Sequence, residues 1–91
     1  MEAKELIQRF KIINFAGEEI LKATRLIEQI EDSEVYDYYK KDLDDMTVKL
    51  YEEIRSLKKD VEEYLKTQEG NSNVHSFNIR KIAKILKTAT V

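Results

Sequence analysis

Very few side chains in this sequence could do covalent chemistry or hold a transition metal. His75 is the only histidine, and the chain contains no cysteine. A nucleophilic Ser or Cys needs an adjacent base such as histidine, and zinc is usually held by about four nitrogen or sulfur ligands. Gly17 and Gly70 stand far apart, so the sequence has no glycine-rich loop that could cradle a phosphate. We therefore predict a protein that is not an enzyme and that uses no cofactor, no metal and no small-molecule substrate.

Carboxylates and one arginine are the remaining candidates for ligand binding. Asp37, Asp42, Asp44 and Asp45 crowd one short stretch, but their spacing is not that of a calcium-binding loop and the required glycine is missing. A solvated helix face explains this cluster better than a site for a hard cation. Arg9 is the only cation that falls within the apolar seam of the first predicted helix. We interpret it as a side chain that extends to solvent rather than as a ligand clamp.

The charges of the chain are unevenly distributed. Lys and Arg number 16 and Asp and Glu number 18, yet residues 70–91 contain four cations and no acid. These cations are Arg80, Lys81, Lys84 and Lys87. One interpretation is that the basic segment lies on the acidic remainder of the chain. The other is that it contacts an external anion, with nucleic acid as the obvious candidate.

The elements that would position these residues are helices. The chain has 91 residues, no proline and 42% hydrophobic residues, which favours one small globular domain over disorder or a repeat protein. We predict an all-α domain over residues 1–91, in which a long antiparallel helical hairpin and a shorter C-terminal third helix form a three-helix bundle. The first helix is expected at about 2–31, because Leu6, Ile13, Ile20 and Ile27 recur every seven residues.

The second helix is expected at about 34–67. Between the two helices, Asp32 or Ser33 could serve as the N-cap. A hairpin is favoured over one continuous helix, which would be ~100 Å long and could not bury its own apolar stripe. Oppositely charged residues four apart, among them Lys58, Glu62 and Lys66, would support its exposed face. The expected core stripe comprises Tyr36, Tyr39, Leu43, Met46, Leu50, Ile54, Leu57, Val61 and Leu65.

A linker is expected at 68–76, where Gly70 and its Asn and Ser neighbours favour turns. The third helix is expected at about 77–89, with Ser76 as its N-cap. Its apolar face would hold Ile79, Ile82, Leu86 and Ala89.

The first helix carries more apolar surface than one neighbour can cover. A second apolar stripe flanks its seam, so the second helix should cover one side and the third helix part of the other. The third helix is too short to cover the whole hairpin, and large uncovered apolar patches usually mark an interface. The alternative is a loosely packed bundle with some exposed apolar side chains. The predicted partner interface comprises Ile12, Phe15, Leu26, Ile30, Tyr38, Val48 and Tyr51.

The last segment, IRKIAKILKTATV at residues 79–91, resembles the first helix of a helix-turn-helix unit. Ala83 lies between Ile82 and Leu86, as small residues do in such helices, and Thr90-Val91 resembles the entry to a recognition helix. That recognition helix would begin where the sequence ends, so we expect a basic amphipathic helix rather than base-specific recognition.

Two functional hypotheses follow from these features. The first is a non-catalytic interaction module, a small accessory subunit that packs on a larger protein or on a second copy. A nucleic-acid-processing assembly for replication, transcription or RNA-guided work would suit its basic segment. The alternative is nonspecific binding to nucleic acid through the basic C-terminal helix. No apolar run approaches a membrane span, so we expect a cytoplasmic protein, and the abundance of Glu, Lys and Ile suits a thermostable one.

Overall fold

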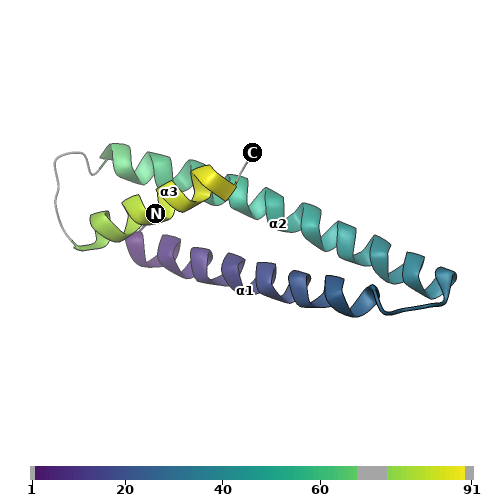
Figure 1. Cartoon of the computed structure of the whole chain (residues 1–91). Coiled ribbons are helices and arrows are strands. Elements are labelled where there is room, and N and C mark those ends of the chain that lie inside the picture. The colour runs from purple at the N-terminus through teal and green to yellow at the C-terminus, as the bar shows by residue number, and fades with distance from the viewer. Residues whose placement is uncertain (1, 68–73, 90–91) are drawn as a thin grey trace.

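The computed structural model describes residues 2–67 and 74–89, and all of its regular structure there is helical. α1 spans Ala3–Ile27, α2 spans Ser33–Thr67 and α3 spans Val74–Ala89. α1 and α2 form a long antiparallel hairpin, and α3 packs at the end where the N-terminus lies (Figure 1). The molecule is elongated, with extents of 57 × 20 × 17 Å. The predicted all-α hairpin with a shorter third helix is confirmed.

The helix ends differ in part from those expected. α1 ends at Ile27 instead of near residue 31, because the N–H groups of Gln29 and Ile30 donate to carbonyls only three residues back, at 3.2 and 3.1 Å. This tighter winding closes the helix. α3 begins at Val74. Ser76 therefore lies inside α3 and not at its start, and the rest of the expected linker, residues 68–73, is outside the described residues.

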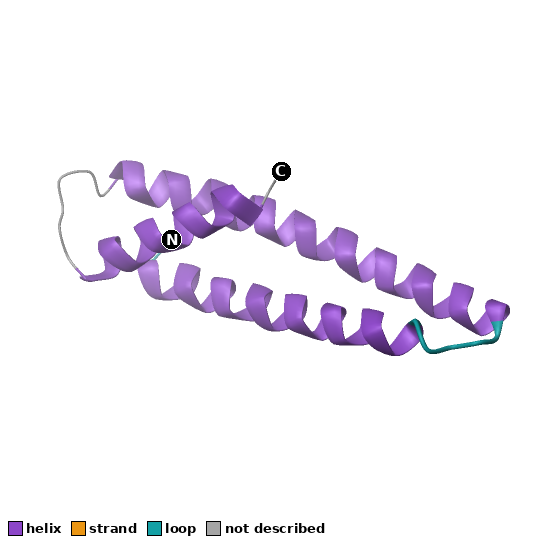
Figure 2. Ribbon diagram, viewed as in Figure 1, coloured by secondary structure: helices purple, strands orange, loops and turns teal. Residues whose placement is uncertain are grey.

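Asp32 is the residue that separates α1 from α2. Its Oδ1 accepts hydrogen bonds from the backbone N–H groups of Glu34 at 2.9 Å and Val35 at 3.1 Å. Its carbonyl accepts the bond from the N–H of Tyr36 at 2.9 Å, the first backbone bond of the new helix. These contacts define Asp32 as the N-cap, and they leave Ser33 as the first residue of α2. Figure 2 shows the turn that this cap ends.

The hydrophobic core is concentrated at the three-helix end. α3 inserts its buried row of Ile79, Ile82 and Leu86 between the two long helices. It meets Leu6 from α1 and Leu57 from α2, both fully buried. The predicted apolar face of α3 is thus confirmed for these three residues. Ala3, Ile13, Ile54 and Val61 complete the buried cluster.

The remaining half of the hairpin is less deeply packed. Leu43 is buried there but lies outside the main cluster. Tyr39 and Met46, which were expected in the core, are 48% and 46% exposed. The reason is that only α1 covers α2 in this half, and two helices cannot enclose a stripe that a third helix encloses elsewhere.

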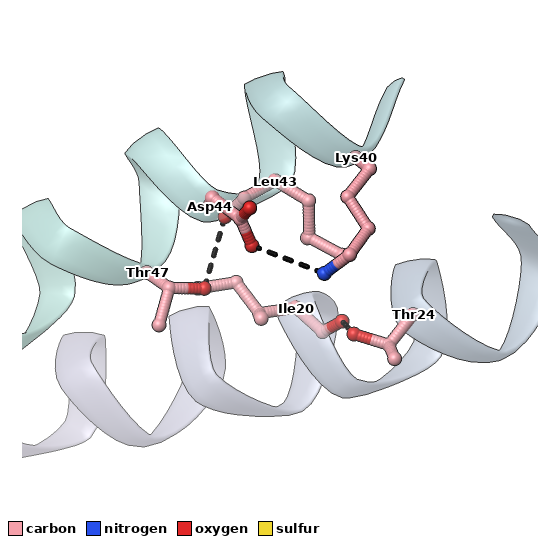
Figure 3. A network of polar contacts seen from close by, with 6 residues as sticks. All are labelled: Ile20, Thr24, Lys40, Leu43, Asp44 and Thr47. Atoms are coloured by element: carbon pink, nitrogen blue, oxygen red, sulfur yellow. Dashed lines mark hydrogen bonds and ion pairs between the residues drawn. The ribbon is translucent and has the colours of Figure 1, made fainter. Parts of the chain in front are cut away.

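Two threonine side chains lie partly buried along the seam between α1 and α2. Thr24 Oγ1 donates to the carbonyl of Ile20 at 2.8 Å, and Thr47 Oγ1 donates to the carbonyl of Leu43 at 2.9 Å (Figure 3). Each hydroxyl thus has a partner within its own helix, so burying it leaves no unpaired donor. Nearby, Lys40 forms an exposed ion pair with Asp44 at 3.5 Å.

α3 packs on the opposite side of α1 from the one predicted. Ile7 and Phe10 pack against the core that α3 completes. Ile12 and Phe15, which were predicted to belong to a partner interface, are left uncovered by α3 and are 58% and 65% exposed. Phe10 and Ile12 point about 160° apart on a helix of 3.6 residues per turn.

Among the described residues, no helix combines the length and apolar character that crossing a membrane requires.

Replacing Asp32 with Ala should lower the free energy of unfolding by about 1 kcal/mol, because two N–H groups of α2 lose their acceptor. Replacing Ser33 with Ala should change it by less than about 0.5 kcal/mol, since Ser33 is not the cap. Urea denaturation followed by circular dichroism measures both values. A larger loss at Ser33 than at Asp32 would contradict the assigned helix start.

Replacing Gly17 with Ala should raise the free energy of unfolding by about 0.5–1 kcal/mol. A Cβ built at Gly17 would meet Leu50 Cδ2 at 3.8 Å, an ordinary van der Waals distance. The gain in helix propensity is therefore not opposed by a clash. A loss of stability in the same denaturation assay would show that α1 and α2 lie closer together at this point.

Candidate functional site

An apolar groove of about 470 Å³ runs between α1 and α2. Ile12, Phe15 and Ile20 line it from α1, and Met46 and Leu50 line it from α2. Ile12 and Phe15 are among the side chains that α3 leaves exposed, so the groove opens on the flank of the hairpin opposite α3. Ala16 also lines the groove, and its small side chain leaves room between its larger neighbours.

Exposed apolar side chains continue from the groove toward the turn. Residues eleven apart on an α-helix complete about three turns and lie on one side. By this spacing Leu26 follows Phe15 on α1, and Val35 precedes Met46 on α2. Tyr38 similarly precedes the groove residue Lys49. Leu26, Val35 and Tyr38 are all exposed, so the groove is the deepest part of a longer apolar strip.

Charged side chains border the groove. Arg9 and Glu53 line it nearer the three-helix end, and Glu19 and Lys49 line it farther toward the turn. Arg9 is engaged with Asp60 and Ser56, so the charges that this border presents to a partner are those of Glu19, Lys49 and Glu53. Such a border favours partners whose charges alternate to match it.

Arg9 connects α1 to α2 at the inner end of the groove. One guanidinium nitrogen donates to Asp60 Oδ2 at 2.6 Å, and the other donates to Ser56 Oγ at 3.2 Å. Both side chains of the ion pair are about three-quarters buried. The sequence-based interpretation of Arg9 as a solvent-directed side chain is therefore wrong, and its role is to join the two long helices.

The predicted interface residues do not form one surface. Ile12 and Phe15 line the groove, while Leu26 and Tyr38 belong to the strip beyond it. Ile30 is half-buried in the turn. The two remaining residues, Val48 and Tyr51, are exposed but point about 160° and 140° away from Met46, so they belong to other faces of α2.

Two residues of this apolar surface were assigned to the core by the sequence pattern. Met46 lines the groove, and the ring of Tyr39 meets that of Tyr38 edge to face at 5.4 Å. A helical wheel places both on the stripe of α2. It does not say how much of that stripe α1 covers.

The four predicted anion-contacting residues of α3, Arg80, Lys81, Lys84 and Lys87, are all exposed. The ammonium of Lys81 lies over the ring of Phe77, 4.6 Å from its centre, which turns this cation toward its own helix. Lys87 lines a shallow groove between α3 and α2.

Two further cations, Lys58 and Lys66, line that same groove from α2, together with Glu62. The sequence pattern had assigned these two lysines only to pairs within their helix. The juxtaposition with α3 could not be found from spacing along one helix.

No group of three or more His, Cys, Asp or Glu side chains that could hold a metal occurs in the part of the chain that the structure describes. The side chain of His75 is not among those described. The aspartates at 37, 42, 44 and 45 are all exposed, and one of them, Asp44, is engaged with Lys40.

Comparison of the chain with models of known protein families, with curated protein sequences and with solved structures finds no match in any of the three. The resemblance of residues 79–91 to the start of a helix-turn-helix unit stays a prediction, and Thr90 and Val91 lie outside the described residues. Side-chain geometry therefore carries the functional inference.

Proposed function

We propose that this chain is a non-catalytic helical interaction module, which acts as a small accessory subunit by receiving an amphipathic helix of another protein chain in the groove between α1 and α2. The observation that carries the proposal is the apolar groove on the flank of the hairpin opposite α3. Ile12, Phe15 and Met46 expose about half or more of their surface there. Exposed apolar surface of this kind is typical of interaction sites.

The other flank of the same hairpin supplies a structural precedent for the ligand. There α3 lies between α1 and α2 and buries Ile79, Ile82 and Leu86, a row with spacings of three and four residues. A groove between two packed helices suits a third helix with such a row, which is a common mode of peptide recognition. We infer that a partner helix inserts a comparable row between Phe15 and Met46.

The energetic scale is compatible with specific binding. Full burial of a large apolar side chain contributes about 1.5–3 kcal/mol, so covering three half-exposed ones contributes roughly 2–5 kcal/mol. A stable interface buries about 1,200–2,000 Å² in total. The groove alone is smaller than that, and the strip through Leu26, Val35 and Tyr38 would extend the contact. The charges of Glu19, Lys49 and Glu53 at the border of the groove would then disfavour a bound helix with mismatched charges.

Site-specific photo-cross-linking tests this function. Phe15 is replaced by p-benzoylphenylalanine in one variant and Leu21 in another, since both side chains are exposed on α1 but only Phe15 lines the groove. After irradiation in cells that naturally make the protein, position 15 should give discrete adducts and position 21 should not. Adding Ile12→Glu to the first variant should reduce the yield at least about tenfold, because a charge would have to be buried.

Association in solution supplies the complementary measurement. If the partner is a second copy, sedimentation equilibrium should show an oligomer that Phe15→Glu dissociates and Leu21→Glu does not. Equal cross-linking from positions 15 and 21, or no adduct from either together with a strictly monomeric protein, would contradict the proposed function.

A further inference from the structure

The structure brings together cations that are far apart in the sequence. Lys58 and Lys66 of α2 and Lys87 of α3 line one shallow groove. Arg55 precedes Lys66 by eleven residues and so lies on the same side of α2. Arg80, Lys84 and Lys87 are all exposed on α3. They follow one another at steps of four and three residues, so they lie on one side of the helix. We name this surface the basic face: Arg55, Lys58, Lys66, Arg80, Lys84 and Lys87.

The cations that α3 contributes to the basic face form no ion pair with the other described residues. Glu62 is the acidic residue that lines the groove with these lysines. Among the described residues, no carboxylate lies within ion-pair distance of Arg80, Lys84 or Lys87. The most acidic stretch, residues 31–45, holds seven carboxylates and two lysines but lies at the turn, at the opposite end of the hairpin from α3 (Figure 1). α3 does pack on the acidic remainder of the chain, but it does so through its buried apolar row, and no ion pair of Arg80, Lys84 or Lys87 with the other described residues holds it there.

We propose that the basic face binds the phosphate backbone of duplex nucleic acid without reading its sequence. This site is separate from the apolar groove and does not depend on it. Its cations form two rows on neighbouring helices, whose axes lie about 8–10 Å apart when packed. Long Lys and Arg side chains on two such rows can contact both phosphate strands that border one groove of a duplex.

The arrangement of the basic face indicates phosphate contact and not base recognition. Arg and Lys side chains contact both phosphates and guanine edges, but this face lies along the sides of two packed helices, and base-specific recognition usually inserts one helix into the major groove. Phosphate contacts fix position but carry no sequence information. Insertion into an anionic membrane is disfavoured, because the apolar row of α3 is already buried in the core.

The separation of charge along the molecule would also orient it. With the basic face against the polyanion, the acidic turn points away from the duplex. The apolar groove, on the flank of the hairpin opposite α3, then stays open to a protein partner. A subunit with these two faces would hold another protein next to nucleic acid.

The salt dependence of binding tests this proposal quantitatively. Fluorescence anisotropy is measured with a labelled 20-base-pair DNA duplex at several salt concentrations. Four to six phosphate contacts predict a slope of about -4 to -5 for log affinity against log salt, or a loss of roughly 300- to 1,000-fold between 50 and 200 mM salt. Duplexes of unrelated sequence should bind equally.

Matched variants locate the contacts. Lys58→Gln with Lys66→Gln should make the slope shallower by about 2, and substituting Arg80, Lys84 and Lys87 with Gln should do so by about 3. Lys40→Gln with Lys41→Gln removes the same charge from α2 near the turn and should leave the slope within about 0.5 of the original. Circular dichroism should show every variant folded, and Phe15→Glu should bind the duplex as the unmodified protein does.

Several outcomes would overturn the proposal. Failure of the unmodified protein to bind duplex DNA at 50 mM salt is one, and it requires no variant. Equal effects of the two double-lysine substitutions would show only a general charge effect. Tighter binding to vesicles containing phosphatidylserine, or to polyglutamate, than to the duplex would assign the basic face to a membrane or an acidic protein instead.

Discussion

The packing of α3 between the two long helices is the interaction on which the rest of the structure depends. Ile79 and Leu86 meet Leu6, Leu57 and Val61, and these side chains are almost fully excluded from solvent. Without α3, this end of the hairpin would expose the same kind of apolar surface that its other flank exposes. A chain of 91 residues can bury only a limited area of apolar surface on folding. Because its core is concentrated at one end of the hairpin, the other end is thinly covered.

The position of α3 explains both candidate functional surfaces. Because α3 fills one flank of the hairpin, the apolar side chains of the other flank, Ile12 and Phe15, are left for a partner. Because α3 lies beside the C-terminal part of α2, Lys87 comes next to Lys58 and Lys66. We therefore propose one molecule with an apolar face for protein and a basic face for nucleic acid, arranged on different sides of the same hairpin.

The features that were predicted correctly from the sequence are those that depend on a single helix. The seven-residue recurrence from Leu6 to Ile27 identified α1, and Asp32 was one of two candidates for the cap that the structure assigns to it. Which flank of the hairpin receives α3 could not be predicted, since periodicity gives angles around each helix but not the side on which a third helix docks. For the same reason Met46 was assigned to the core, and Lys58 only to pairs within its helix.

Native-state hydrogen exchange of the backbone amides tests most directly whether α3 divides the hairpin into a closely packed and a thinly covered half. Exchange from a well-packed core requires nearly global unfolding, whereas thinly covered segments open locally at lower free energy. The slowest amides should lie in 6–13, 54–61 and 79–86, and those of 20–27 and 33–46 should exchange measurably faster. Equal protection along both long helices would contradict this account, because it would show that the half near the turn is as firmly packed as the three-helix end.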